Sequence, residues 1–269
     1  MSTDQQRDEP HDRPHDRPRT ALVGGGAGGI GAAAAAALLK DGHRVVLAGR
    51  SEKTLTDTAA RLGGGVDHLV CDLADAAAAT AAVAEVEQRH GSLDVLIVNA
   101  GGPSPGRVLD VGDTQWHDAM DLLLLGPLAL LRAALPGMAG RGFGRVVVVT
   151  STAVRQPQPE LATSTVLRSA ITAAAKLTSL EHADRGITVN CVAPGATLTP
   201  RRLQIFQSRA VASGITLDEA AAQDQADIPA GRSAEPEEIA AAIAFLASAG
   251  AGYVNGTVLT VDGGRTETI

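Results

Sequence analysis

Aromatic residues are scarce in this chain of 269 residues, where three Phe, one Trp and one Tyr make up 2% of the total. Apolar residues still account for 45% of the sequence, and charged residues for 20%. These proportions are typical of a globular protein, so we expect an aliphatic core built from Ala, Val, Leu and Ile. The length suits one sizeable domain and is short for two.

Cysteine and lysine are also rare. Two cysteines, Cys71 and Cys191, cannot form a disulfide framework, and nearly all of the 23 basic residues are Arg. The net charge of −7 and the isoelectric point near 5.5 argue against nucleic acid or an anionic membrane as the main partner. The first twenty residues are polar and charged, which is unlike a secretory signal, so we expect a cytoplasmic protein.

One long uncharged stretch, Ala21 to Leu39, has the length of a membrane span. Six of its residues are glycines clustered in one half, and most of the others are Ala. A glycine-rich turn between a strand and a helix explains this composition better than a membrane span does. We therefore expect no membrane association.

The rest of the chain alternates between strands and helices. Residues 1–19 carry many charges and the repeat HDRP-HDRP, which predicts a disordered tail, and residues 20–269 form one domain. Apolar strands are predicted at 20–24, 44–48, 68–71, 94–98, 145–150, 187–192 and 257–261. Helices are predicted between them, including one capped by Ser51, one from a cap at Asp113 to about 135, and one over 162–184.

Apolar strands that alternate with helices imply an α/β fold: a Rossmann-type, doubly wound parallel sheet of about seven strands with helices on both faces. Residues 200–228 are polar, Ala-rich and weakly patterned, so we expect a mobile helical insertion over a substrate site. Ligands of such folds bind beyond the carboxyl ends of the strands. The chemically informative residues are therefore those that follow each strand.

The first strand runs into the sequence GGGAGGIG, residues 24–31, which opens a helix. Glycines at this place let the backbone approach a pyrophosphate, which the helix N-terminus attracts. The second strand ends in Gly49-Arg50 and has no acidic residue to bind a ribose 2′-hydroxyl. Arg50 suits a 2′-phosphate instead, which favours NADP(H) over NAD(H).

Further motifs give the chain a specific resemblance. Asp72-Leu73, Asn99-Ala100-Gly101 and Pro194-Gly195-Ala196-Thr197-Leu198-Thr199 follow the glycine-rich loop in order. With this spacing, residues 19–265 resemble a short-chain dehydrogenase/reductase of the compact single-domain branch. The resemblance implies oligomers, tetramers or dimers, and NADP(H) held by Gly25, Ala27, Gly28, Gly29, Ile30, Gly31, Arg50, Asp72, Leu73, Asn99, Ala100, Gly101, Pro194, Gly195, Thr197 and Thr199.

The catalytic residues depart from that family, whose chemistry normally needs Asn, Ser, Tyr and Lys. Ser151 matches the family Ser, but Ser164 stands in place of Tyr, Arg168 in place of Lys and Leu123 in place of Asn. The single tyrosine, Tyr253, precedes the last strand, and no Tyr-x-x-x-Lys occurs anywhere in the sequence. We therefore predict Ser151, Ser164 and Arg168 as the catalytic residues.

This set of residues constrains the chemistry. An aliphatic hydroxyl is a poor general acid, and a guanidinium can hold a ribose, a phosphate or an oxyanion but cannot relay protons. The leading hypothesis is an NADP(H)-dependent ketone reductase or alcohol dehydrogenase whose proton comes from water or from the substrate. Two alternatives stay open: a non-redox enzyme such as a dehydratase, cyclase or isomerase, and a non-catalytic nucleotide-binding or regulatory protein.

The partner implied by the leading hypothesis is a small molecule with a carbonyl or alcohol group. The sequence shows no ligand spacing typical of a metal site and no Gly-x-Ser-x-Gly typical of serine hydrolases. Gln156 and Glu160, in a loop with two prolines, and His117 are weaker candidates for a replacement polar group.

Overall fold

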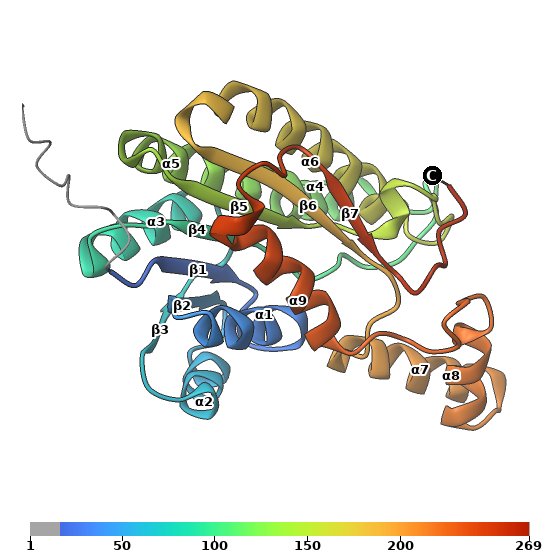
Figure 1. Ribbon diagram of the computed structural model, residues 1–269. Helices are drawn as coiled ribbons and strands as arrows, with labels where there is room; N and C mark the ends of the chain where they lie inside the picture. The colour runs from blue at the N-terminus through green and yellow to red at the C-terminus, as the bar shows by residue number, and fades with distance from the viewer. Residues whose placement is uncertain (1–16, 269) are drawn as a thin grey trace, which may run out of the picture.

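The computed structural model describes residues 17–268, apart from the side chains at positions 208 and 209. Within this range one parallel sheet has the strand order β3-β2-β1-β4-β5-β6-β7 (Figure 1). The strands are β1 (Thr20–Gly24), β2 (Arg44–Gly49), β3 (Val66–Val70), β4 (Val95–Val98), β5 (Gly144–Val149), β6 (Ile187–Pro194) and β7 (Val258–Val261). The order reverses direction at β1, as in a doubly wound sheet, and confirms the predicted fold class.

Helices cover both faces of the sheet (Figure 1). One face carries α1 (Gly29–Lys40), α2 (Glu52–Leu62) and α9 (Pro236–Ala247), and the other carries α3 (Ala76–His90), α4 (Asp113–Met120), α5 (Gly126–Arg141) and α6 (Ala162–Glu181). The two cores between sheet and helices consist of Ala, Val, Leu and Ile with few other types. Small side chains therefore let the helices approach the sheet closely.

The uncharged stretch Ala21 to Leu39 forms β1, a glycine turn and α1, as predicted. A second stretch, Asp113–Arg141, is long and apolar enough to cross a membrane by length and composition alone. Half of the most apolar part of this stretch is buried inside the fold, where α5 packs beside α3. Core helices of soluble proteins pass the same test.

The stretch Asp113–Arg141 differs from the sequence prediction in its cap and in its continuity. The sequence predicts one helix from a cap at Asp113 to about residue 135. The structure has Gly112 as the cap and a π-helical turn, Asp121–Leu125, between α4 and α5. At Gly126, directly after the π turn, a Cβ would overlap the carbonyl oxygen of Leu73, so the helix passes the loop after β3 as closely as a glycine allows.

The predicted tail, residues 1–19, lies largely outside the described residues. Residues 17–19 are described, and they contact the domain. Arg17 Nη1 donates a hydrogen bond to Ser92 Oγ at 2.7 Å, and the carbonyl of Arg19 accepts one from the Arg44 amide at 2.8 Å. The predicted boundary of the tail was therefore wrong for these three residues, because charge composition alone does not show which cations find acceptors.

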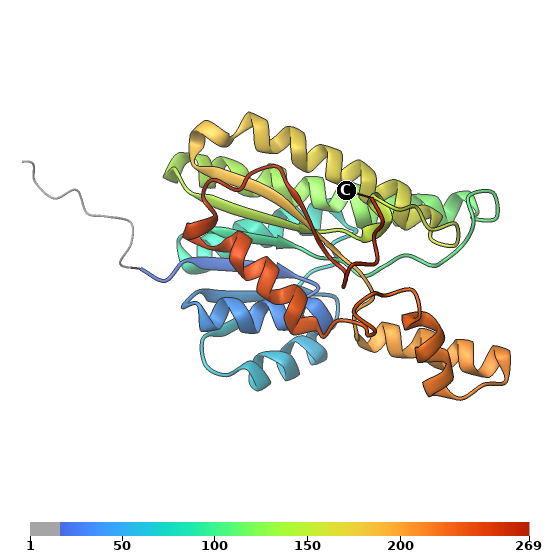
Figure 2. The same cartoon turned by 45° about the vertical axis from the view of Figure 1, so that its right-hand side comes forward.

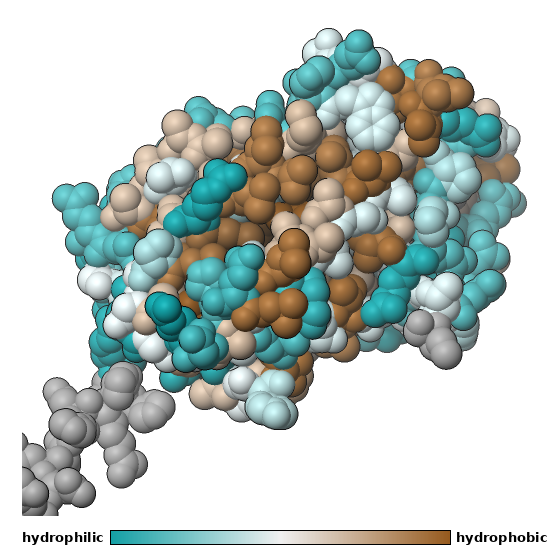
Figure 3. All heavy atoms as spheres, turned by 90° about the horizontal axis from the view of Figure 1, so that it is seen from above, coloured by the Kyte–Doolittle hydropathy of each residue, from teal (hydrophilic) through white to brown (hydrophobic). Residues whose placement is uncertain are grey.

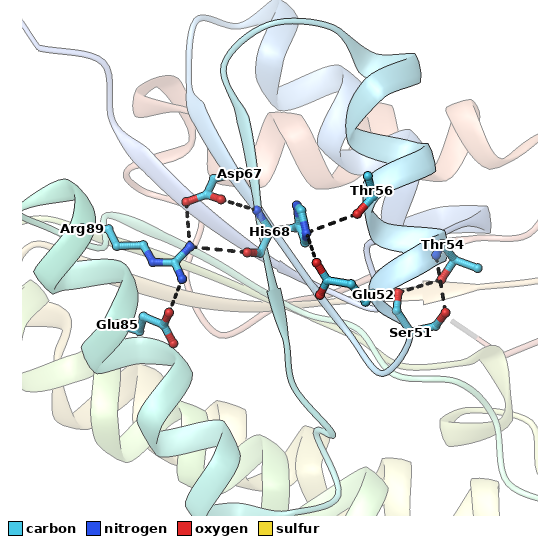
Figure 4. Close-up of polar contacts among 8 residues, drawn as sticks. All are labelled: Ser51, Glu52, Thr54, Thr56, Asp67, His68, Glu85 and Arg89. Carbon is cyan, nitrogen blue, oxygen red and sulfur yellow. Dashed lines mark hydrogen bonds and ion pairs between the residues drawn. The ribbon is translucent and has the colours of Figure 1, made fainter.

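Strand β3 lies at one edge of the sheet and carries polar side chains (Figure 4). Asp67 accepts a hydrogen bond from Arg89, which also pairs with Glu85, and His68 Nε2 lies 2.9 Å from Glu52 Oε1. Ser51 caps α2, as predicted, by accepting from the Thr54 amide. Charged groups of this kind keep an exposed edge from pairing with another strand.

Residues 200–228 fold into two helices, α7 (Pro200–Ser213) and α8 (Leu217–Gln225). They project from the domain beside the carboxyl ends of the strands (Figures 1 and 2). Thr199 caps α7 by accepting from the Arg202 amide, and Arg202 pairs with Asp224 of α8. The helical character matches the predicted insertion, and its mobility stays a prediction.

Candidate active site

Two cavities open at the carboxyl edge of the sheet. The larger, about 510 Å³, lies beyond β1, β2 and β3, and the smaller, about 230 Å³, lies beyond β4, β5 and β6. Ala100, Gly102 and Arg201 line both cavities. The two cavities are therefore neighbours, and together they form a groove beside the point where the strand order reverses, which is where folds of this kind bind ligands.

The glycine-rich loop forms the floor between the cavities. Gly25 has a φ of +58°, and a Cβ there would lie 2.7 Å from Asn99 Nδ2. Gly31 packs against the carbonyl of Gly25 so closely that a Cβ would overlap it, so this glycine serves the packing of α1 on β1. A Cβ at Gly28 would point into open space, and no side chain caps α1. The N–H groups of its first turn therefore remain available to a pyrophosphate.

The larger cavity contains the predicted adenosine side of the nucleotide site. Gly25, Ala27, Arg50, Asp72, Leu73, Ala100 and Gly101 all line it. Arg50 is exposed at its rim beside Ser51 and Thr54, and among the described residues no carboxylate forms an ion pair with it. The guanidinium is thus available to a 2′-phosphate.

The smaller cavity contains the predicted nicotinamide side. Ile30, Asn99, Pro194, Gly195, Thr197 and Thr199 line it. Asn99 Nδ2 donates to the carbonyl of Gly24 at 3.1 Å and so joins the β4 loop to the β1 loop. Gly29, with a φ of +51°, brings the backbone close to the Thr199 side chain. The predicted cofactor residues therefore either line the groove or shape the backbone beneath it.

The three predicted catalytic residues meet in the smaller cavity. Arg168 Nη1 donates to the carbonyl of Val149 at 2.7 Å, and Arg168 Nε donates to Ser164 Oγ at 3.2 Å. Ser151 Oγ accepts from the Ala153 amide at 3.2 Å. Both serine oxygens thus accept hydrogen bonds from the protein, which leaves their own O–H groups free to donate to a ligand.

Arg168 is a buried cation, with 8% of its surface exposed. Burial, together with the nearby positive charge of Arg201, lowers the pKa of Arg168 to about 10. The side chain therefore stays charged at neutral pH. It places a positive charge at the wall of the smaller cavity.

The position that the family gives to Asn is closed by apolar side chains. Leu123 lies within the π-helical turn, is 3% exposed, and packs with Ala119 and Leu167. Trp116 and Met120 cover this cluster. The side chain of Leu123 itself offers no polar group to a water molecule.

The weaker candidates lie away from the cavity. Glu160 pairs with Arg107, and Gln156 accepts a hydrogen bond from the Glu267 amide. His117 is exposed and bonds to the carbonyl of Asp113. None of these three lines either cavity, so they do not replace the missing proton donor.

The sequence reasoning missed Arg201. It comes from the first turn of α7 and donates to the carbonyls of Gly102 and Pro103 across the groove, the second at 2.7 Å. The available signal was the pair Arg201-Arg202 at the start of a helix. The helix dipole disfavours a cation at a helix N-terminus, so two arginines at that position indicate a role other than stabilising the helix.

Comparison with known proteins agrees with this geometry. The family model described as enoyl-(acyl carrier protein) reductase matches residues 25–266. Short-chain reductase protein NovJ of Streptomyces niveus is 34% identical over 248 residues, which cover 91% of this chain and 93% of NovJ. This chain belongs to the short-chain dehydrogenase/reductase family.

Other members of the short-chain dehydrogenase/reductase family are similar over nearly their full length. The 3-oxoacyl-[acyl-carrier-protein] reductase of Haemophilus influenzae is 32% identical over 246 residues, covering 91% of this chain and 97% of that one. The crystal structure of a variant of actinorhodin polyketide ketoreductase with NADPH superposes with a TM-score of 0.89 at 33% identity, covering 93% of this chain and 98% of that one. The family prediction is confirmed, and this chain is an oxidoreductase by membership.

Proposed function

We propose that this chain is an NADP(H)-dependent ketone reductase in which Ser151, Ser164 and Arg168 replace the family's Ser, Tyr and Lys. The observation that carries the proposal is the pair of neighbouring cavities: Arg50 lines one of them, and the Ser151–Ser164–Arg168 cluster lines the other. Relatives named as 3-oxoacyl reductases, and a similar ketoreductase solved with NADPH, support the same activity.

The groove fits the cofactor on structural grounds. Arg50 would hold the 2′-phosphate, the uncapped N-terminus of α1 beside Gly28 would hold the pyrophosphate, and Pro194, Gly195 and Thr199 would line the nicotinamide. When bound, NADPH supplies a hydride to a carbonyl carbon. The task of the protein is to position the substrate carbonyl and to stabilise the charge that develops on its oxygen.

The cluster can do this without a general acid. The O–H groups of Ser151 and Ser164 would donate hydrogen bonds to the carbonyl oxygen, and the Arg168 cation would stabilise its negative charge. The proton would then come from water or from an acidic group of the substrate. Loss of the general acid costs about 10²–10⁴ in rate, which slows the reaction without abolishing it.

The first test is a thermal-shift titration with NADPH, NADP, NADH and NAD. Ligand at a hundred times its Kd stabilises the native state by about 2.7 kcal/mol, and we expect a clear shift with NADPH and NADP only. A carbonyl panel then follows the loss of NADPH absorbance. No shift with any of the four nucleotides would overturn the proposal, and turnover that survives removal of all nicotinamide would indicate the non-redox alternative.

We also propose that the chain works as a homo-oligomer, a tetramer or a dimer, in the cytoplasm. An apolar band runs across the face of the molecule that includes α6 (Figure 3). Val166, Leu177 and Leu180 of α6 and Leu125 of the π-helical turn are exposed there. Exposed apolar patches of this kind favour association with another protein surface, and the two free cysteines suit a reducing compartment.

A further inference from the structure

The smaller cavity is strongly positive. Three arginines, Arg168, Arg201 and Arg202, line it, and its described lining contains no Asp, Glu or His. Arg202 is paired with Asp224. Two positive charges, those of Arg168 and Arg201, therefore face the cavity with no carboxylate of the described chain to offset them.

Arg168 is the more informative of the two because it is buried. Its described acceptors, the Val149 carbonyl and the Ser164 hydroxyl, are both neutral, and no hydrogen bond from Nη2 to a described residue is present. Burial of a cation without a counter-ion is costly. A ligand anion that accepts from Nη2 would offset that cost, whereas a neutral ligand would not.

Arg201 stands at the rim, on the opposite side of the groove from α6. Its two terminal nitrogens donate to the carbonyls of Gly102 and Pro103, which hold the guanidinium over the junction of the two cavities. It lies at the N-terminal turn of α7, so the positive end of that helix adds to its charge. Its Nε is not used in these contacts and is available to a ligand.

We propose that the substrate of this site is a small oxo acid, a carbonyl compound whose carbonyl oxygen lies at Arg168 and whose free carboxylate, a few carbons away, is bound by Arg201. The proposal rests on the proposed reductase function and names the substrate class for it. The reaction converts the oxo acid, NADPH and one proton from water into the hydroxy acid and NADP. The nicotinamide would occupy part of the smaller cavity, whose volume is about 230 Å³, so only a short substrate has room beside it.

The test compares acids with their uncharged counterparts. Initial rates with NADPH are measured for pyruvate, acetoacetate and levulinate and for the methyl ester of each, with the native protein, Arg201→Ala and Arg107→Ala. Arg107→Ala is the matched control, because it removes an exposed cation from the same loop as Gly102 and Pro103, where it pairs with Glu160 outside the cavity.

We expect at least one acid to exceed its ester in kcat/KM by about tenfold or more, since a hydrogen bond to a charged group contributes about 1.5–3 kcal/mol. Arg201→Ala should reduce that preference about tenfold by raising KM for the acid, and Arg107→Ala should leave the preference as it is. Esters that match or exceed the acids would overturn the proposal. So would an Arg201→Ala variant that loses NADPH affinity while its acid preference is retained, because Arg201 would then serve the cofactor phosphates.

A binding measurement separates this inference from the reductase function. Calorimetry of the NADPH complex with benzoate and with benzamide reports anion recognition without turnover. Tighter binding of benzoate, weakened by Arg201→Ala, supports the inference even where no carbonyl is reduced, and in that case only the reductase function fails. Equal binding of the two compounds contradicts the inference even where NADPH is oxidised by a neutral ketone.

Discussion

At the scale of single residues, Arg168 explains how this site differs from a Tyr-Lys site. A lysine in its place would lower the pKa of a neighbouring tyrosine, but Ser164 has no group that titrates near neutrality. Arg168 instead spans two acceptors, the Val149 carbonyl and the Ser164 hydroxyl. In the proposed mechanism Arg168 contributes a fixed positive charge, so the reaction rate should show little dependence on pH in the neutral range.

The pH profile of the chemical step tests this. The pKa of Arg168 is lowered to about 10, so the cation is present below that pH and is lost as the pH rises through it. We expect a reduction rate that is constant across the neutral range and declines near pH 10, measured under saturating NADPH. Arg168→Met should lower kcat by about 10²–10³, as for loss of one oxyanion donor, and should remove the alkaline decline. Unchanged activity in Arg168→Met would contradict this role.

Arg50 makes a separate prediction about the cofactor. Arg50→Glu replaces the cation at the rim of the larger cavity with a carboxylate that repels a 2′-phosphate and accepts from a ribose 2′-hydroxyl. NADPH affinity should fall about 10- to 100-fold, from the loss of about 1.5–3 kcal/mol, whereas NADH affinity should stay the same or improve. Fluorescence titration with both nucleotides measures the ratio. Equal losses for NADPH and NADH would show that Arg50 does not contact the phosphate.

The sequence identified most of the residues that line the two cavities, but it did not show which other side chains lie next to them. Asp72, Asn99 and Thr199 could be placed because each follows an apolar strand, and parallel strands end at one edge. Arg201 could not, because its position depends on how α7 folds back over the β4 loop. The same limit applies to the nearby charge of Arg201 beside Arg168, because it depends on how α7 packs against the rest of the chain.

At the scale of helices and strands, the π-helical turn is the feature that the sequence did not predict. The stretch from Asp113 to Arg141 is continuously apolar in its middle, and periodicity gives no sign of an interruption. The structure relates the turn to Gly126, which lies against the carbonyl of Leu73. That contact joins the helix to the loop that lines the larger cavity.

A pair of glycine substitutions in α5 tests this contact. In Gly126→Ala the new Cβ would overlap the Leu73 carbonyl, so we expect a loss of about 1–3 kcal/mol in stability together with weaker NADPH binding. In Gly140→Ala nothing lies within 4 Å of the new Cβ, and stability should rise by about 0.5–1 kcal/mol, as for Gly to Ala in a helix. Denaturant melts of both variants measure the difference, and similar stability in the two would contradict the contact.

At the scale of the whole molecule, the two faces of the sheet are covered but the outer surface of α6 is not. Leu177 and Leu180 are 60% and 65% exposed on α6, and an apolar band runs across this face of the molecule (Figure 3). Leu109 and Val211 are still more exposed, at 94% and 85%, but they lie on the loop after β4 and on α7, not on α6. Exposure alone therefore does not distinguish an interface, whereas continuity of the apolar surface does.

Light scattering of two double variants tests the proposed assembly. Leu177→Glu/Leu180→Glu would bury charge between copies of α6, so we expect the mass to fall from a multiple of 27.3 kDa toward that of one chain, with a lower Tm because assembly stabilises the native state. Leu109→Glu/Val211→Glu adds the same charge at exposed positions and should change neither mass nor Tm, since surface substitutions usually stay within about 0.5 kcal/mol. A native protein that is already a single chain in solution would contradict the proposed assembly, and dissociation by the second variant alone would place the contact on α7 and the β4 loop.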